Sequence, residues 1–434
     1  MGIGKRLAAL AAVVALALAV SACSGGSTTV KSAGNSNGHG SAASPSPSSA
    51  SGDVKITPAD GSRDANPSKG IAVTTTHGTL TGVTVKTSGG KGGKVSGSYS
   101  RGKSAWHSAW ALGVSQSYTV TATASVNGQP VTRTSSFRTL SPSSTFSTEI
   151  INGYHQTYGV GMPILLYFSK KITDRAAVER SLQVTTSKPV IGAWYWDNSC
   201  GTAPTCAYFR PRDYWPAGTK VSFTGHLDGV EGAPGVYGYH TLTQTFTIGQ
   251  SVVAVGSTAS HHTQIYVDGK QRYDWPISTG RPGDDTPDGS YLTIEKENPV
   301  RMTGPGYSLE VPWSVRFTWS GDYYHDAYWS TSEQGYTNVS HGCVNLSPTD
   351  AEIYYKLAVP GDPITIQGSP QSGTWDNGWT MWFKSWKDYL KGSALGEAVK
   401  AGPHGSTFVN PSTLPPDTAK APLHTSPANN AAAS

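Results

Sequence analysis

Apolar and polar residues alternate in short runs along most of the chain after residue 53, and turn residues separate the runs. A period of two is typical of β-strands that bury one face. The stretch SYTVTATASVNGQPVTRTSSFRTL shows this most clearly, because Asn127-Gly128 supplies a two-residue turn in its middle. It predicts a β-hairpin whose buried face consists of Tyr118, Val120, Ala122 and Ala124.

Two successive segments carry this pattern at the size of an immunoglobulin-like β-sandwich. In residues 53–140, either Trp106 or Trp110 is expected to fill the core between two sheets. In residues 141–249, MPILLYFSKKI predicts a buried strand, and TDRAAVERSLQV predicts a short helix with Thr173 as its N-cap. The fold class expected for the chain is mostly β, with these two modules preceding a further β-rich domain.

The composition agrees with short strands and turns. Gly, Ser, Thr, Pro and Trp are abundant, whereas charged residues make up only 14% of the chain. The net charge is +5 over 434 residues, and the Lys and Arg residues are scattered. Since there is no basic stripe and no known nucleic-acid motif, nucleic acid is not an expected partner.

The N-terminus has the features of an export signal. Lys5 and Arg6 precede an apolar run over residues 7–20 that is short for a membrane span. Small residues stand directly before Cys23, which resembles a bacterial lipobox; the alternative is an ordinary signal peptide with an incidental cysteine. We expect a lipoprotein signal peptide over residues 1–22 and lipid on Cys23. The protein would then be exported and anchored to the outer face of the cytoplasmic membrane, facing the cell wall.

Residues 23–52 contain few apolar side chains. Such a segment cannot bury enough surface to offset the entropy lost on ordering. We expect a flexible Ser/Gly/Pro tether that lets the folded part work away from the bilayer.

The chain has four cysteines. Cys200 and Cys206 flank GTAPT, a hairpin-like loop, and in an exported protein such a close pair is expected to form a disulfide bond. With Cys23 assigned to lipid, Cys343 has no partner. A free thiol outside the cell is a liability unless it has a use.

The neighbours of Cys343 suit a thiol nucleophile. His341 stands two residues before it and could favour the thiolate, and Gly342 allows backbone to approach a substrate closely. If residues 339–345 are extended, His341, Cys343 and Asn345 lie on one face.

A second histidine, His325, stands eighteen residues before Cys343. The GYTN sequence between them suggests a loop that folds back and brings His325 to the thiol. Two other roles for the thiol are a buried packing residue and a zinc ligand together with His325 and His341. Polar neighbours argue against packing, and the lack of a close ligand pair argues against zinc, so no metal is expected.

His325, a loop and then SHGCVN resemble the signature of the L,D-transpeptidases, the YkuD-type cell-wall enzymes. That signature is a histidine, a spacer of comparable length, Ser/Thr-His-Gly-Cys, any residue and usually Asn. The flanking TPDGSY and SPTDAEIYYKLAVPGDPITI are also similar to the family's catalytic domain. The resemblance implies a catalytic domain over residues 250–369 and, with the two modules, covers roughly residues 53–395.

The resemblance implies a reaction and its catalytic residues. Cys343 would attack the carbonyl between the third residue and D-Ala of a peptidoglycan stem tetrapeptide, release D-Ala and hold a thioester. An amine of a diamino acid on a second stem would resolve it and form a 3→3 cross-link. His325 would be the base, oriented by the carbonyl of Asp326, and His341 would support the site and polarise the thiol.

The resemblance also implies the residues that bind the substrate. Met302, Tyr307 and Trp329 would line the donor pocket, with the Tyr307 hydroxyl near the oxyanion. Ser340 and Asn345 would support the loop, and backbone N–H groups at 342–343 would complete the oxyanion hole. No cofactor is implied, and β-lactams of the carbapenem type would acylate the thiol. The substrate-binding residues expected are therefore Met302, Tyr307, Trp329, Ser340, Gly342 and Asn345.

Two alternatives stay open at this point. An L,D-carboxypeptidase that trims tetrapeptide stems would differ only in that water resolves the thioester. A non-catalytic peptidoglycan-binding lipoprotein would use the same fold to hold stem peptides.

The C-terminal part is rich in tryptophan and then in Pro, Ala and Thr. Within residues 370–398, Trp379, Trp382 and Trp386 have helical spacing and predict a helix docked on the catalytic domain. A glycan-stacking or membrane-facing surface is the alternative for these aromatic rings. The composition of residues 399–434 predicts a disordered tail.

Overall fold

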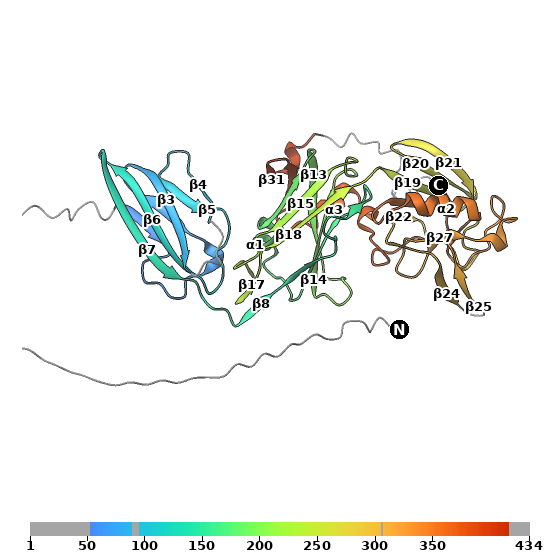
Figure 1. Ribbon diagram of the computed structural model, residues 1–434, viewed down its shortest axis with the longest axis horizontal. Helices are drawn as coiled ribbons and strands as arrows, with labels where there is room; N and C mark the ends of the chain where they lie inside the picture. Colours follow the sequence, from blue (N-terminus) through green and yellow to red (C-terminus); the bar gives the residue numbers. More distant parts are fainter. Residues whose placement is uncertain (1–52, 89–94, 305–306, 416–434) are drawn as a thin grey trace, which may run out of the picture. The chain divides into compact units, whose positions relative to one another are not determined.

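The computed structural model describes residues 53–88, 95–304 and 307–415. The predicted signal peptide (1–22), the predicted tether (23–52) with Cys23, and the last part of the predicted tail lie outside the described residues. Within the described ranges, no helix has the length and apolar character that a membrane-spanning helix needs. Strands dominate all three domains, which confirms the expected mostly-β fold class (Figure 1).

The first module is a sandwich of two antiparallel sheets. Its strands are β1 (Val54–Thr57), β2 (Ala72–Thr75), β3 (Thr79–Ser88), β4 (Gly97–Tyr99), β5 (Ala105–Ser108), β6 (Ser117–Val126) and β7 (Gln129–Arg138), with a short 3₁₀ helix, η2 (Pro67–Lys69). One sheet has the order β1-β2-β5-β4 and the other β3-β6-β7. Trp106 is buried in the core between them, whereas Trp110 is only half-buried.

The predicted hairpin is confirmed. β6 pairs with β7 from Ser117↔Arg138 to Val126↔Gln129, and the turn residues Asn127 and Gly128 have φ values of 50° and 78°. Two positive φ values are what a type I′ turn requires. The four side chains predicted for the inner face are all buried: Tyr118, Val120, Ala122 and Ala124.

The second module is also built from packed sheets. Its elements are β8 (Ser144–Phe146), β9 (Thr148–Ile150), β10 (Thr157–Tyr158), β11 (Ile164–Phe168), α1 (Arg175–Arg180), β12 (Leu182–Thr186), β13 (Val190–Asp197), β14 (Thr205–Pro211), β15 (Lys220–Gly225), β16 (Glu231–Ala233), β17 (Val236–Gly238) and β18 (Leu242–Ile248). One sheet has the order β10-β18-β15-β12, and a second contains β13-β14-β11-β9. The side chains between them form a large aromatic core around Trp194, Phe209 and Phe223.

Two local predictions in this module have different outcomes. The disulfide bond between Cys200 and Cys206 is present. The short helix is present as α1, but its N-cap is Asp174, whose side chain accepts a hydrogen bond from the Ala177 N–H at 3.0 Å. The prediction of Thr173 was wrong by one residue, because the Asp174 carboxylate reaches the free N–H groups of the first turn.

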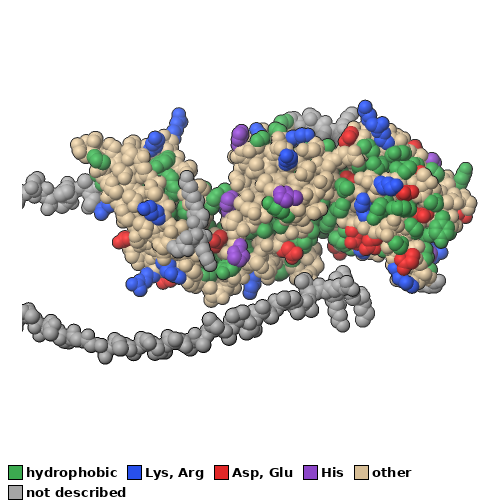
Figure 2. Space-filling view, in the orientation of Figure 1, with side chains coloured by type: hydrophobic (Ala, Val, Ile, Leu, Met, Phe, Trp, Pro, Cys, Tyr) green, Lys and Arg blue, Asp and Glu red, His purple; other side chains and the backbone are tan. Residues whose placement is uncertain are grey.

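The catalytic domain expected from the sequence consists of two sheets, a hairpin and a helix. Its elements are β19 (Val252–Ser257), β20 (His262–Val267), β21 (Lys270–Pro276), β22 (Gly289–Leu292), β23 (Glu295–Glu297), β24 (Val300–Gly304), β25 (Tyr307–Val311), β26 (Ser314–Arg316), β27 (Tyr323–Asp326), η3 (Tyr328–Ser330), β28 (Val344–Leu346), α2 (Pro348–Leu357) and β29 (Pro363–Gln367). The sheets have the orders β21-β20-β19-β29-β22 and β23-β26-β27-β28. A third core, around Tyr291, Phe317 and Tyr324, lies in this domain. On the face seen in Figure 2, hydrophobic side chains gather over this domain, whereas Lys and Arg side chains stand singly.

The tryptophan-rich segment does not form the single helix that was expected. It contains a 3₁₀ turn, η4 (Met381–Phe383), and a short helix, α3 (Trp386–Leu390), and Lys384 between them is extended. The Trp382 indole N–H donates to the Gly161 carbonyl at 2.8 Å, and Trp379 and Trp382 belong to the core of the second module. The helical spacing was misleading because the tryptophan rings lie on separate short elements and pack mainly against the second module.

The prediction of a disordered tail is wrong for its first part. β30 (Ala398–Gly402) pairs with β13, β31 (Gly405–Val409) pairs with β30, and η5 (Pro411–Thr413) follows. The two strands extend a sheet of the second module to the order β31-β30-β13-β14-β11-β9. The Pro/Ala/Thr-rich composition gave no sign that Val399 and Ala401, on either side of Lys400, are buried in the core. Residues 416–434 lie outside the described residues.

Candidate active site

Strand pairing brings His325 and Cys343 together. β27 and β28 are parallel neighbours, with His325 opposite Asn345. Parallel strands require a crossover, and residues 327–343 supply it. Cys343 is the last residue of this crossover, directly before β28. The predicted return of the loop to His325 is therefore confirmed.

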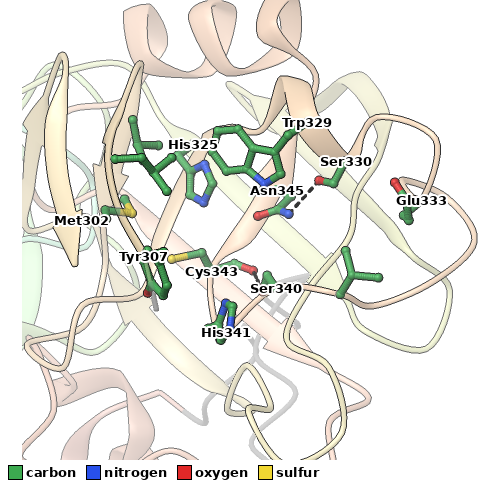
Figure 3. Close-up of a pocket in the computed structure, with 13 residues that line it drawn as sticks. Met302, Tyr307, His325, Trp329, Ser330, Glu333, Ser340, His341, Cys343 and Asn345 are labelled. Atoms are coloured by element: carbon green, nitrogen blue, oxygen red, sulfur yellow. Dashed lines mark hydrogen bonds between the residues drawn. The ribbon is translucent and has the colours of Figure 1, made fainter. Parts of the chain in front are cut away.

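Most of the predicted site residues surround one cavity of about 420 Å³. Figure 3 shows the His325 ring above the Cys343 side chain, with Tyr307 beside the sulfur and His341 below it. The cavity also contains apolar side chains from the β24–β25 hairpin. The predicted residues that line it are Met302, Tyr307, His325, Trp329, Ser340, His341, Cys343 and Asn345.

His325 is held as a neutral base. Its side chain is buried, and Nδ1 lies 2.7 Å from the carbonyl oxygen of Asp326. A carbonyl can only accept, so Nδ1 carries the proton and Nε2 is left as an acceptor. Burial lowers the pKa of His325 to about 4, against the smaller opposing effect of the Asp326 hydrogen bond. The Trp329 ring stacks on the imidazole at 5.8 Å between centroids.

Cys343 is a protonated thiol at neutral pH. Its Sγ lies 3.7 Å from the Gly321 carbonyl oxygen, to which the thiol donates. Burial raises the pKa of Cys343 to about 12, the carboxylate of Asp322 raises it further, and a backbone hydrogen bond from Tyr323 acts in the opposite direction. With a neutral thiol beside a neutral imidazole, the resting site holds no ion pair between them.

Residues 340–343 form a tight turn rather than an extended strand. Gly342 has a φ of 125°, which only glycine adopts without strain. The Ser340 hydroxyl donates to the Cys343 carbonyl at 2.6 Å and accepts from the Gly342 N–H at 3.2 Å. The expectation of a single extended face was therefore wrong, and one of the two backbone donors predicted for the oxyanion hole is already engaged.

His341 and Asn345 differ in their exposure to solvent. His341 is exposed and packs against Tyr307, with 5.2 Å between ring centroids, and the contacts of the described residues include no hydrogen bond from it to the thiol. Its role in polarising the thiol stays a prediction. Asn345 is buried and donates to the Ser330 hydroxyl at 2.9 Å, which ties β28 to the start of the crossover.

Sequence reasoning missed several residues of the site. Thr286 donates to the Gly342 carbonyl at 2.7 Å and fixes the turn from outside the motif. Asp322 lies against Gly342 and contributes to the pKa of the thiol. The only signal for Asp322 was its place three residues before His325 in GDYYH, directly before the strand that carries the base.

Cys343 also borders a second cavity, of about 670 Å³. The two cavities share Met302, Tyr307, His341 and Cys343, and Gly342 lines only the second. The nucleophile is thus reachable from two sides. Among the described residues, no group of three His, Cys, Asp or Glu side chains is arranged to hold a metal ion.

Known proteins resemble this chain over most of its length. Residues 251–366 match the L,D-transpeptidase catalytic domain, YkuD, and residues 62–231 match a bacterial Ig domain. L,D-transpeptidase 5 of Mycobacterium tuberculosis is 34% identical over 349 residues, which cover 78% of this chain and 76% of the relative. L,D-transpeptidase 2 of Mycobacterium tuberculosis is 30% identical over 341 residues, which cover 74% of this chain and 82% of the relative.

A solved structure of LD transpeptidase LdtMt1 in complex with imipenem is 33% identical, covers 52% of this chain and 100% of its own, and has a TM-score of 0.43. The identity and coverage of the two relatives show the family, and the YkuD match spans the residues that surround the cavity. The chain belongs to the L,D-transpeptidase family.

Proposed function

We propose that this enzyme forms 3→3 cross-links between peptidoglycan stem peptides through a thioester on Cys343. The observation that carries the proposal is the pairing of a protonated thiol with an imidazole whose free Nε2 faces the same cavity. This pair needs no metal and no cofactor to transfer an acyl group. The family membership supports the reaction class, and the cavity supports a peptide-sized substrate.

In the first half-reaction, the thiol attacks the carbonyl carbon between the third stem residue and D-Ala. His325 takes the thiol proton as the C–S bond forms, and then gives it to the nitrogen of D-Ala as the C–N bond breaks. D-Ala leaves and a thioester remains. His325 is available as the proton acceptor at physiological pH because burial lowers its pKa to about 4 and keeps the imidazole neutral.

The oxyanion formed during attack needs donors that keep their protons. Tyr307 borders the thiol in both cavities, and burial raises the pKa of its hydroxyl above the ordinary value. A phenol with a raised pKa stays a donor. Met302, Trp329 and the apolar side chains Leu309 and Val311 of the hairpin β24–β25 would bind the donor stem.

In the second half-reaction, the side-chain amine of a diamino acid on another stem attacks the thioester. The C–N bond forms, the C–S bond breaks, and a proton from the nitrogen returns to the sulfur through His325. If water attacked instead, the product would be a trimmed tripeptide. The same thiol would open the ring of carbapenem β-lactams, because their strained carbonyl presents an equivalent target for Sγ.

We also propose that the protein works outside the cell while attached to the cytoplasmic membrane through lipid on Cys23. Support comes from the basic residues, apolar run and small residues that precede Cys23 in the sequence. A Cys23→Ala variant would remain unprocessed and would not incorporate labelled fatty acid. Incorporation by that variant would disprove this attachment site.

The reaction is tested by mass spectrometry of the full chain with a disaccharide-tetrapeptide. The wild type is expected to release D-Ala and to give a product with the mass of two stems minus one D-Ala. Cys343→Ala should give neither. D-Ala release without the dimer would identify a carboxypeptidase, and peptide binding without any release would leave a binding protein.

A further inference from the structure

We propose that Asp322 binds the acceptor amine as an ammonium ion in the second cavity and takes its first proton, so that an amine rather than water resolves the thioester. This inference rests on the proposed transpeptidation and assigns the residue that selects its second substrate. The carboxylate of Asp322 lies beside the nucleophile, and the fold does not evidently require it to be charged.

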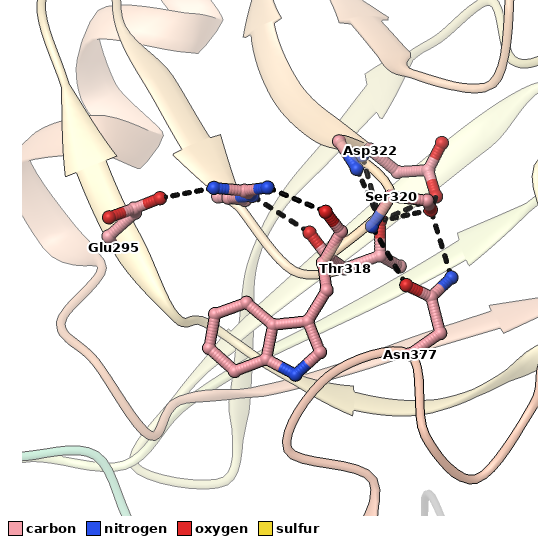
Figure 4. A network of polar contacts seen from close by, with 8 residues as sticks. Glu295, Thr318, Ser320, Asp322 and Asn377 are labelled. Atoms are coloured by element: carbon pink, nitrogen blue, oxygen red, sulfur yellow. Dashed lines mark hydrogen bonds and ion pairs between the residues drawn. The ribbon is translucent and has the colours of Figure 1, made fainter. Parts of the chain in front are cut away.

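The carboxylate of Asp322 is anchored through one oxygen. Oδ2 accepts from the Thr318 hydroxyl at 2.6 Å and from the Ser320 hydroxyl at 3.2 Å. Figure 4 shows this network, which continues from Ser320 to Asn377, with one carboxylate oxygen inside it and the other outside. Among the described residues, no hydrogen-bond donor reaches Oδ1.

The free oxygen lies next to the catalytic turn. A Cβ placed on Gly342 would be 2.5 Å from Oδ1 of Asp322. Gly342 directly precedes Cys343, and Asp322 and Cys343 line the same cavity of about 670 Å³. A group bound to Oδ1 is therefore held within reach of an acyl group on the sulfur.

A carboxylate at this position opposes the formation of a thiolate. Asp322 contributes to the raised pKa of Cys343, and burial raises the pKa of Asp322 itself. The thioester, like the resting protonated thiol, carries no charge that could pair with this carboxylate. The carboxylate then faces a neutral acyl group, and the partner that satisfies it is a cation such as the ammonium of a diamino acid.

The other charged groups of the second cavity already have partners. Arg316 lies 2.6 Å from Glu295, Arg301 lies 3.4 Å from Glu310, and the Asp284 carboxylate lies 2.8 Å from Arg281.

Asp285 accepts from the Gly283 N–H at 3.3 Å. Among the charged side chains that line this cavity in the described part of the chain, Asp322 has a carboxylate oxygen that accepts no hydrogen bond. The same oxygen lies against Gly342 of the catalytic turn.

The step balances as follows. The ammonium gives one proton to Asp322, and the neutral amine attacks the thioester carbonyl carbon. The C–N bond forms and the C–S bond breaks. A second proton of the nitrogen passes through His325 to the Cys343 sulfur, and the proton on Asp322 leaves to solvent. The thiol, the imidazole and the carboxylate are then in their starting states.

The test compares the full-length wild type with Asp322→Asn, which keeps the shape of the side chain and an acceptor for Thr318 and Ser320. The donor is a disaccharide-tetrapeptide, and the acceptor is a stem tripeptide that carries diaminopimelate. Hydroxylamine, which is uncharged at neutral pH, serves as a second nucleophile. Asp285→Asn is the matched control, since it removes a carboxylate from the same cavity.

We expect Asp322→Asn to release D-Ala in the first turnover at least as fast as the wild type and to react normally with hydroxylamine. Transfer to the tripeptide should fall about 10- to 100-fold, the size of a lost charged hydrogen bond, with tripeptide released by hydrolysis instead. Asp285→Asn should transfer like the wild type. Unchanged transfer in Asp322→Asn, or an equal loss with hydroxylamine, would overturn the inference while leaving transpeptidation intact. A wild type that forms no acyl-enzyme would overturn both.

Discussion

The Nδ1–H of His325 donates a hydrogen bond to the carbonyl oxygen of Asp326 at 2.7 Å, one residue along the same strand. This contact fixes the imidazole tautomer from the backbone, without a carboxylate partner. The Asp326 side chain therefore does not supply the negative charge that would keep an imidazolium in place. The base of this enzyme, His325, is therefore neutral in the resting site.

The first prediction concerns the pH dependence of acylation. With a pKa of about 4, His325 is about 90% neutral at pH 5, whereas an ordinary histidine would be only about 3% neutral there. Acylation by a carbapenem, followed by loss of absorbance, should therefore change little between pH 5 and pH 8. Long-range ¹H–¹⁵N spectra should show the Nδ1–H tautomer and a midpoint near 4. A fall in rate centred near pH 6.5 would contradict this.

The second prediction concerns the reactivity of the free thiol. Because the pKa of Cys343 is about 12, the thiolate fraction at pH 7.5 is tiny. Alkylation by iodoacetamide should be at least about 100-fold slower than for an ordinary cysteine and should rise about tenfold for each pH unit up to pH 10. Intact mass measures it, with Cys343→Ala as the background. Rapid alkylation that is independent of pH would mean a resting thiolate–imidazolium pair.

The third prediction concerns the catalytic turn. Gly342→Ala would place a Cβ 2.5 Å from Asp322 at a φ of 125°, which costs about 1–3 kcal/mol in backbone strain before the clash is counted. Acylation should fall at least about 100-fold. Gly283→Ala is the control, because its φ of 93° is also positive but no atom lies within 4 Å of the added Cβ. Equal effects of the two changes would show that the contact with Asp322 is unimportant.

The fourth prediction concerns Ser340. Ser340→Ala removes the hydrogen bonds to the Cys343 carbonyl and from the Gly342 N–H. Two such bonds are worth about 1–3 kcal/mol in total, so acylation should fall about tenfold or more. Ser340→Thr retains the hydroxyl and should stay within about threefold of the wild type. A Thr variant as slow as the Ala variant would assign the effect to packing.

The alternation of apolar and polar residues predicted the strands, because each strand of a sandwich buries one face and exposes the other. The hairpin around Asn127-Gly128 and the core position of Trp106 follow from that alone. The motif predicted that Cys343 and His325 share one cavity. The loop between them is long enough to bring β28 back beside β27 as a parallel neighbour, and this pairing brings the two residues together.

Contacts between distant segments could not be predicted in the same way. Asp322 matters through Gly342, twenty residues later, and nothing in its own neighbours announces this. Trp382 has helical spacing with Trp379, yet it is fixed by the carbonyl of Gly161. In both cases the decisive partner lies in another part of the chain, where local patterns carry no information.

The fifth prediction concerns the C-terminal strands. A chain that stops at Gly396 loses β30 and β31 and uncovers the edge of β13, together with the surface that Val399 and Ala401 bury. The second module should lose at least about 2 kcal/mol of stability. A chain that stops at Pro415 keeps both strands and should match the full chain. Urea unfolding followed by tryptophan fluorescence distinguishes them, and equal midpoints would show that the strands do not support the module.

β30 also determines how the catalytic domain can move. The chain leaves the second module after β18, forms the catalytic domain, and returns to the same module as β30 beside β13. The catalytic domain is thus connected to the second module by two segments of the chain instead of one linker. Rotation of the catalytic domain relative to the second module would twist both segments together. In the proposed transfer between stem peptides, a load on the bound substrate would be divided between two polypeptide connections.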